Sequence, residues 1–420
     1  MRALLVSVVL FVVLTFTGSA FAAGEIALYE AGAHQPGPAG IAAGPDGNLW
    51  FTDAGVNGAA GIGSITTGGV ATEHKLAGQL PRSGITAGPD KALWFTEPAV
   101  STGIGRLTTT GQEERFEVKK GEPWQIAESR SADGKPDGNL WFTIHGTEHK
   151  IGYINDSTKT VTEVGLEVAG QPEDIVGGPE GDLWVTVPAS HKIVRVNPSE
   201  PKEQHAFEIE GGLEPSRISA TFTPPNGELW FTVKNAAEVG RLVPNKQETP
   251  TLKMFSVLVG KGAGSSTNDI AVGPEGDLWF TYNKLAEIGR LAPESFTEGK
   301  LLEGRFSAWP IPSVSKTKPE EEDYANASTE EREQLEQRAS EEHAKHEEYG
   351  AGAITAGADG NMWFTLPAPG TTRGRIGRPE SRLTRAVTMA TPADGPSLGT
   401  APDGTWMWMS CFLKKSGSMS

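Results

Sequence analysis

Cysteine and basic residues are scarce in this sequence. The 420-residue chain has one cysteine, Cys411, so it cannot form an internal disulfide, and the sequence shows no Cys/His spacing typical of a zinc site. It carries 37 Lys and Arg against 53 Asp and Glu, a formal net charge of −16. Nucleic acids and anionic membranes require a basic surface on their partners, so this charge balance argues against both.

Long apolar runs are missing except at the N-terminus. There, Arg2 precedes the apolar stretch Ala3–Phe16, and Ser19–Ala23 has the small residues of a cleavage site. This pattern predicts a signal peptide over residues 1–23, cut after Ala22 or Ala23, and a mature protein that is secreted, periplasmic or at the cell surface. A retained anchor is the alternative, although a membrane span needs about 20 residues. We expect no membrane span after signal removal.

One ten-residue phrase recurs along the chain. It reads GPDGNLWFTD at Gly44–Asp53, with close copies at Gly88–Glu97 and Gly273–Tyr282. Aligning its tryptophan gives seven copies, at Trp50, Trp94, Trp141, Trp184, Trp230, Trp279 and Trp363. The first six are 43–49 residues apart and the last gap is 84 residues. Short apolar runs and glycine-rich turns at this period are typical of four-stranded β-propeller blades, so an all-β propeller is predicted.

The repeat also predicts how the ring closes. Each unit gives an inner strand of small residues, a Pro-Asp-Gly turn, the LWFT strand whose tryptophan packs between blades, a third strand and an outer strand. Glu25–Glu30 resembles an outer strand with no unit before it, so it can complete the last blade and remove the sheet edges. Counting a worn copy at Ala401–Ser410 favours eight blades, with seven as the alternative. Residues 24–420 are then one propeller domain.

The 84-residue gap holds an acidic insert at residues 315–350. Between Glu320 and Glu348 it contains twelve acidic and three basic residues. Ser328 and Glu331 form a capping box, which is consistent with a polar helix, although apolar residues are too sparse to bury well. We expect a solvated helix or a disordered segment on one face of the disc, and a lid over the channel mouth is one prediction for it.

The repeated phrases GPDGNLWFT, KIGYI and EIGRL resemble those of the streptogramin B (virginiamycin B) lyase family, over about Glu25 to Cys411. The resemblance implies a propeller that opens a cyclic depsipeptide antibiotic by elimination across its ester, with Mg2+ as cofactor. It also implies a histidine after the proline that opens the inner strand in each of the last two blades, and a last-blade glutamate before a cysteine. These positions match Ser397, a residue near Gly352, and Ser410, so the family's catalytic groups are not kept.

Other polar residues lie in loops that should surround the channel mouth. His145 and Glu148 are the candidate catalytic pair, because no other repeat contains them. The remaining candidates line the same mouth: Trp124, His149, Glu173, Asp174, His191, Arg217 and Asp269. Together these residues predict a site for a divalent metal or a polar ligand, with the metal unspecified. The alternative interpretation is that the loop histidines and glutamates are merely solvated.

Two functions therefore compete. The first is a metal-assisted carbon–oxygen lyase acting on a streptogramin B antibiotic, and hence an antibiotic-resistance protein, through relocated groups. The second is a non-catalytic propeller, a monomer that holds a small molecule, peptide, glycan or cell-wall ligand at the channel mouth. The missing family residues favour the second, so enzyme activity stays an open question. A lactone hydrolase is a weaker third possibility, because Asp174 and Asp269 alone are too few carboxylates.

Overall fold

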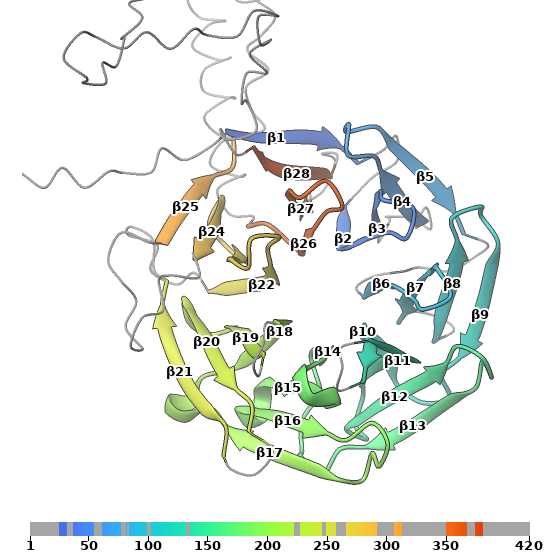
Figure 1. Ribbon diagram of the computed structural model, residues 1–420, viewed down its shortest axis with the longest axis vertical. Helices are drawn as coiled ribbons and strands as arrows, with labels where there is room; N and C mark the ends of the chain where they lie inside the picture. The colour runs from blue at the N-terminus through green and yellow to red at the C-terminus, as the bar shows by residue number, and fades with distance from the viewer. Residues whose placement is uncertain are drawn as a thin grey trace, which may run out of the picture. The chain divides into compact units, whose positions relative to one another are not determined.

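A computed structural model describes thirteen segments of the chain, all of them within the compact unit Met1–Ser381 (Figure 1). They are residues 25–31, 37–53, 61–76, 81, 84–98, 102–131, 135–221, 227–245, 249–257, 266–291, 306–312, 350–367 and 374–380. These segments form seven four-stranded antiparallel sheets, the blades. The predicted signal peptide at residues 1–23, the insert at 315–349 and the copy at Ala401–Ser410 lie outside the described residues.

The first four blades follow the chain from the inside outwards. Blade 1 is β2 (Pro38–Ala43), β3 (Leu49–Asp53), β4 (Gly61–Ile65) and β5 (Ala71–Lys75). Blade 2 is β6 (Ile85–Ala87), β7 (Ala92–Glu97), β8 (Gly103–Thr108) and β9 (Glu113–Glu117). Blade 3 is β10 (Glu122–Arg130), β11 (Pro136–His145), β12 (Lys150–Asn155) and β13 (Val161–Gly165). Blade 4 is β14 (Ile175–Gly177), β15 (Leu183–Val187), β16 (Lys192–Val196) and β17 (Gln204–Glu208).

The last three blades repeat this order, and the final one borrows its outer strand. Blade 5 is β18 (Pro215–Thr221), β19 (Glu228–Val233), β20 (Glu238–Val243) and β21 (Thr251–Ser256). Blade 6 is β22 (Thr267–Val272), β23 (Leu278–Tyr282), β24 (Glu287–Leu291) and β25 (Phe306–Pro310). Blade 7 is β26 (Ile354–Ala356), β27 (Met362–Leu366), β28 (Arg375–Glu380) and β1 (Glu25–Glu30). Short 3-10 turns lie at Pro179–Gly181, Pro188–Ser190 and Glu210–Gly212.

The N-terminal strand closes the ring, as predicted, but on the seventh blade. β1 pairs antiparallel with β28, with Tyr29 opposite Ile376, and takes the outer position of that sheet. Each inner strand contacts the inner strand of the next blade, and β26 contacts β2. The preference for eight blades was therefore wrong, and the alternative of seven is what the structure shows. The count of eight required a further outer strand after β28, and β1 already occupies that place.

The recurring tryptophans pack between blades, as predicted. All seven are at most 7% exposed. Trp94 of blade 2 lies in one apolar cluster with Ile126 and Phe142 of blade 3. Trp363 of blade 7 packs in the same way against Phe51 of blade 1. Each wedge thus buries a large aromatic surface against its neighbour, which supplies much of the hydrophobic driving force for the ring.

A ring of buried threonines ties the inner strands together. Each is the threonine that follows the repeated tryptophan by two residues, and all are 0% exposed: Thr52, Thr96, Thr143, Thr186, Thr232, Thr281 and Thr365. Every Oγ1 accepts a hydrogen bond at 2.9–3.0 Å from an inner-strand N–H of its own blade. Six of them also donate, at 2.5–3.3 Å, to a carbonyl of the next blade. These bonds fix the positions of residues around the axis.

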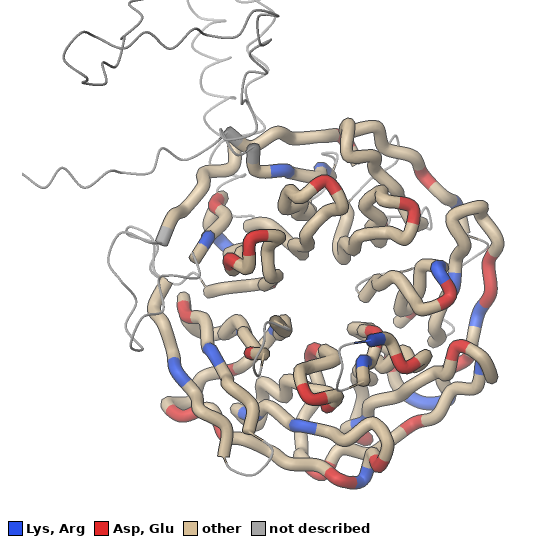
Figure 2. Tube along the Cα trace, viewed as in Figure 1, with Lys and Arg blue, Asp and Glu red and all other residues tan. Residues whose placement is uncertain are grey.

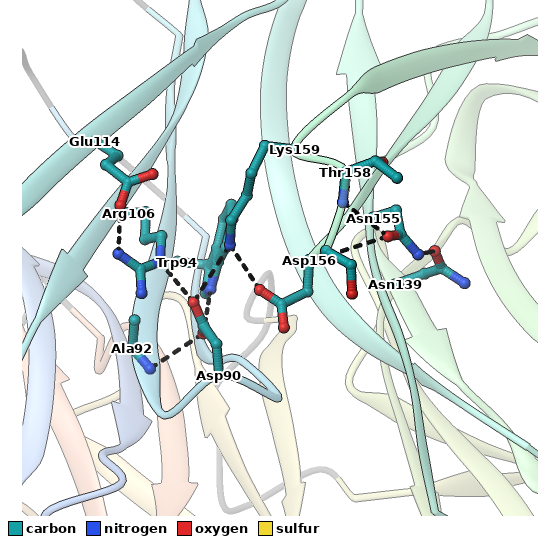
Figure 3. A network of polar contacts seen from close by, with 11 residues as sticks. Asp90, Ala92, Trp94, Arg106, Glu114, Asn139, Asn155, Asp156, Thr158 and Lys159 are labelled. Carbon is teal, nitrogen blue, oxygen red and sulfur yellow. Dashed lines mark hydrogen bonds and ion pairs between the residues drawn. The ribbon is translucent and has the colours of Figure 1, made fainter.

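A second repeated contact joins the turn, the tryptophan and the third strand. In blade 2, Trp94 Nε1 donates to Asp90 Oδ1 at 2.9 Å, and Arg106 Nε donates to Asp90 Oδ2 (Figure 3). Lys159 of blade 3 lies 4.7 Å above the Trp94 ring and 3.5 Å from Asp90. Its ammonium also pairs with Asp156 at 2.6 Å. The turn aspartates therefore act as acceptors for the tryptophan and the arginine, a structural role.

Candidate functional site

Seven inner-strand positions surround the axis of the ring. In every blade, the residue that precedes the first inner-strand isoleucine occupies this place: Gly40, Gly84, Gln125, Asp174, Arg217, Asp269 and Ala353. All of them except Gly84 line one cavity of about 260 Å3, together with Ala39, Ile41, Ile85, Asn268, Gly352 and Pro367. The cavity, here called the axial pocket, gathers three of the predicted site residues from three different blades.

Asp174 joins blades 4 and 5. Its Oδ1 accepts the Ile175 N–H at 2.9 Å, and its Oδ2 accepts the Ile218 N–H of the next blade at 2.9 Å. Burial is the largest influence on this carboxyl and raises its pKa from 3.8 to about 6, opposed by Arg217 and assisted by the charge of Asp269. The group is thus a clamp between strands and also an acid that titrates near neutral pH.

Asp269 repeats the arrangement between blades 6 and 7. Its Oδ2 accepts the Ile354 N–H at 2.8 Å, and a backbone bond from Ile270 supports it further. Burial raises the pKa of Asp269 as well, and the charge of Arg217 opposes that rise. The two aspartates therefore flank Arg217 at equivalent positions of consecutive blades.

Arg217 is the one basic side chain of the axial pocket. It extends from β18, and its backbone N–H donates to Thr232 Oγ1 at 3.0 Å. Its guanidinium acts electrostatically on both aspartates, but it makes no hydrogen bond or ion pair with any described residue. The guanidinium carries five N–H donors, and none of them has an acceptor among the described residues.

The predicted His145 is the last residue of β11 in blade 3 and does not line the axial pocket. Its ring stacks on Trp124, with 4.6 Å between ring centroids. Burial lowers the pKa of His145, while Glu173 raises it, so the imidazole is neutral at pH 7. His145 Nε2 and Trp124 Nε1 are both buried without a hydrogen-bond partner among the described residues. Glu173 also lies 3.9 Å from Lys234 Nζ.

Glu148 is held by lysines rather than poised for proton transfer. Its carboxylate pairs with Lys120 Nζ at 2.9 Å and with Lys150 Nζ. Hydrogen bonds from Lys150 and then Lys120 lower the pKa of Glu148 to about 2. A second cavity, of about 320 Å3, lies around this loop and is lined by both lysines, His145, Glu148 and His149. Glu148 therefore remains ionised and paired at neutral pH.

The two predicted loop histidines have equivalent places, and each joins neighbouring blades. His149 and His191 both adopt positive φ, 48° and 56°, directly before the third strand of their blade. His149 Nδ1 accepts the Gly170 N–H at 3.2 Å, and His191 Nδ1 lies 3.1 Å from the Leu213 carbonyl oxygen. Both rings thus bind the backbone segment that leads into the next blade.

The implied Mg2+ does not fit the axial pocket well. Mg2+ requires several oxygen ligands in octahedral geometry. The pocket offers Asp174 and Asp269, but Arg217 already supplies a positive charge between them. Within the described segments, no three His, Cys, Asp or Glu side chains converge to hold a metal ion. The residues of the axial pocket therefore do not form a suitable Mg2+ site.

The fold and the pocket define a seven-bladed propeller with a charged axial pocket. The model of the virginiamycin B lyase family matches residues 17–129 and 132–302, so the chain belongs to that family. A structure of a streptogramin B lyase is 19% identical, with a TM-score of 0.62 over 86% of this chain and 98% of the other. The Staphylococcus aureus virginiamycin B lyase is 22% identical, with a TM-score of 0.61 over 84% and 98%.

Other comparisons support the fold alone. A catalytically inactive Staphylococcus aureus virginiamycin B lyase with quinupristin is 22% identical, with a TM-score of 0.60 over 84% of this chain and 98% of that one. No curated protein matches the chain. At these identities the shared structure is the propeller, and the site must be argued from the residues present.

The seven-blade ring changes where the family's catalytic histidines should map. With blades 6 and 7 as the last two, the positions for which the resemblance implies histidine lie two residues before the repeated isoleucine and hold Asn268 and Gly352. Asn268 Nδ2 donates to the Ala351 carbonyl at 3.0 Å, a bond between blades. Ser397 and Ser410, the positions matched from the sequence, lie outside the described residues. Neither Asn268 nor Gly352 can act as a base or as an imidazole ligand.

Proposed function

We propose that this chain is an exported member of the virginiamycin B lyase family that binds a small polar ligand in the axial pocket without turnover. The observation that carries the proposal is Arg217, which lines the 260 Å3 cavity with Asp174 and Asp269. Its guanidinium acts electrostatically on both carboxyls and has no hydrogen-bond partner among the described residues. A few polar groups converging in a concave, otherwise apolar site are typical of small-molecule recognition.

The chemistry of the remaining groups agrees with binding rather than elimination. Ester elimination requires a base for the α-proton and an electrophile for the carbonyl. Asn268 and Gly352 supply neither. A binding site needs only that these groups hold fixed positions, and the threonine ring provides that.

A relocated lyase site is the second candidate. Its support is His145, a neutral imidazole whose Nε2 has no partner within the described segments. Its weakness is Glu148, because the two lysines keep the pKa of that carboxyl at about 2. In this reading His145 would take the proton, and Mg2+ would stay a proposed cofactor.

Mass spectrometry distinguishes the two candidates. Purified protein is incubated with virginiamycin B and Mg2+, and the molecular mass of the antibiotic is then measured. The binding proposal expects an unchanged antibiotic. Ring opening without gain of water would establish elimination and contradict the proposal, whereas opening with gain of water would indicate a hydrolase.

The binding site itself is tested by filling it. A thermal-shift screen of amino acids, short peptides and cell-wall sugars is run on the wild type and on Ala353→Phe, which places a ring in the axial pocket. Val70→Phe is the matched control, because Val70 is 66% exposed in a hairpin. The proposal expects ligands whose stabilisation is lost in Ala353→Phe and kept in Val70→Phe. If the stabilisation by every ligand is the same in wild type, Ala353→Phe and Val70→Phe, the binding site lies outside the axial pocket.

Export rests on the sequence of the first 23 residues. Among the described residues, no helix has the length and apolar character of a membrane span. Expression of the full chain with a C-terminal tag, followed by N-terminal sequencing of the protein outside the cytoplasm, tests cleavage after Ala22 or Ala23. A retained N-terminus would favour the anchor.

A further inference from the structure

The axial pocket has two chemically different halves. Blades 7, 1 and 2 contribute only small or apolar residues: Gly352, Ala353, Pro367, Ala39, Gly40, Ile41 and Ile85. Blades 3 to 6 contribute only polar ones, Gln125, Asp174, Arg217, Asn268 and Asp269. In Figure 2 the inner strands β2, β6 and β26 are tan throughout, because they contain no Lys, Arg, Asp or Glu. A ligand that fills this cavity must have a charged end and an apolar body.

The charges alternate in sign around the polar half. Equivalent positions in blades 4, 5 and 6 are occupied by Asp174, Arg217 and Asp269. The side-chain charges along this wall of the pocket are therefore negative, positive and negative. With both carboxylates ionised, the three groups sum to one negative charge, which disfavours a simple anion. A ligand with one negative and one positive group, close together, complements this order.

Each charged group retains capacity for such a ligand. The backbone N–H groups of Ile175 and Ile218 occupy one lone pair on each Asp174 oxygen, and Ile354 occupies one on Asp269 Oδ2. A carboxylate has about four acceptor sites, so both side chains can still accept from an ammonium. The Arg217 guanidinium can donate two parallel bonds to a carboxylate. The backbone bonds also fix the aspartates before the ligand arrives, which lowers the entropy cost of binding.

We propose that the axial pocket binds a free α-amino acid with an apolar side chain. Its carboxylate pairs with Arg217, its ammonium lies against Asp269 and Asp174, and its side chain packs on Ile41, Ile85 and Ala353. This inference rests on the proposed function and names its ligand class. The cavity of about 260 Å3 is below the usual range for drug-sized ligands, roughly 300–1,000 Å3. It therefore suits one amino acid rather than a longer peptide.

Calorimetry with matched analogues tests the proposal. The full chain is titrated with L-leucine, with N-acetyl-L-leucine, which lacks the positive charge, and with L-leucinol, which lacks the negative one. Each lost charge-assisted contact is worth about 1.5–3 kcal/mol, so both analogues should bind at least tenfold more weakly than L-leucine. An analogue that binds as well as L-leucine would overturn the zwitterion proposal.

Variants test which side chain binds the carboxylate of the ligand and which binds its ammonium group. Arg217→Met should weaken L-leucine at least tenfold and leave the weak binding of L-leucinol unchanged. Asp269→Asn should weaken L-leucine and leave N-acetyl-L-leucine unchanged. Arg241→Met is the control, because the Arg241 guanidinium pairs with Glu228 away from the pocket. Equal effects of Arg217→Met on L-leucine and L-leucinol would contradict the assignment.

The failure of this inference is separable from that of the proposed function. If L-leucine, L-valine and L-phenylalanine all fail to bind at millimolar concentration, the amino-acid proposal is wrong. The axial site would still stand if other ligands of the screen lose their stabilisation in Ala353→Phe. If no ligand responds to Ala353→Phe, both proposals fail together.

Discussion

Thr365 Oγ1 of blade 7 donates a hydrogen bond to the carbonyl oxygen of Ala39 in blade 1 at 3.0 Å, across 326 residues of chain. The same hydroxyl accepts the Ala353 N–H at 2.9 Å. The contact is one member of the threonine ring, and it is the member that joins the last blade to the first. The inner strands, and with them the axial pocket, are therefore positioned by hydroxyls as well as by tryptophans.

Replacing a ring threonine by valine should destabilise the fold without changing its shape. Thr365→Val keeps the volume and removes one donor and one acceptor. The Ala353 N–H and the Ala39 carbonyl, both half-buried, then lose this partner. Each such group costs about 1–3 kcal/mol, which urea denaturation measures as a lower midpoint. Thr72→Val, on the exposed face of β5, is the control and should be near neutral. Equal stability of the two variants would show that the ring contributes nothing.

Replacing Lys91 by glycine should stabilise the protein. It occupies the turn position that is glycine in blades 1 and 6, and it has a φ of 59° where Gly47 and Gly276 have 83° and 79°. A non-glycine residue in the left-handed region costs roughly 1–2 kcal/mol. Lys91→Gly should therefore raise the free energy of unfolding by about 1 kcal/mol, measured by urea denaturation. The reciprocal Gly47→Ala should lower it, and a destabilised Lys91→Gly would contradict the turn assignment.

Replacing different members of the repeated tryptophan set should destabilise the protein by different amounts, although all of them occupy the same position in their blades. Trp94 Nε1 bonds to Asp90, whereas Trp141 Nε1 is buried without a partner among the described residues. Both side chains are at most 1% exposed. Trp94→Phe should thus cost about 0.5–1.5 kcal/mol more than Trp141→Phe, the worth of one net hydrogen bond. Thermal denaturation of the pair measures the difference. A larger loss in Trp141→Phe would refute the ranking.

Asp174 should make stability depend on pH. Burial raises the pKa of Asp174 in the folded protein from 3.8 to about 6, while Arg217 lowers it and Asp269 raises it. The folded state thus binds the proton more tightly than the unfolded state, and this contribution to stability is lost as pH rises from about 4 to 6. The stability of Asp174→Asn relative to wild type should therefore increase across that window. A difference that does not vary with pH would show that Asp174 has an ordinary pKa.

Much of the fold could be predicted from the sequence because every repeat contains the same structural features. Glycine at the turns, the buried tryptophan and the small inner strand each recur, so the blade and its closure by Glu25–Glu30 could be predicted. The blade number could not, because the copy at Ala401–Ser410 matches the pattern by composition. Which strand takes the open edge of β28 is decided by pairing across about 350 residues, from Tyr29 to Ile376.

The candidate site was predicted only in part. Asp174, Arg217 and Asp269 were found because polar residues at inner-strand starts stand out from glycine and alanine. Gln125 and Asn268 were missed. Gln125 occupies the position of Asp174 one blade earlier, and Asn268 directly precedes Asp269, so aligning the residues around the repeated isoleucine would have found both. His145 and Glu148 were singled out as unique, and only coordinates show Glu148 between two lysines.

Nuclear magnetic resonance on the labelled protein tests the location of the ligand most directly. The Nε–H signal of Arg217, assigned through Arg217→Met, is followed together with the ring signals of His149, which lines the other cavity, while L-leucine is added. We predict that the Arg217 signal shifts in proportion to occupancy and that the His149 signals stay in place. A shift confined to His149, with Arg217 unchanged, would place the ligand in the blade 3 loop and contradict the axial site.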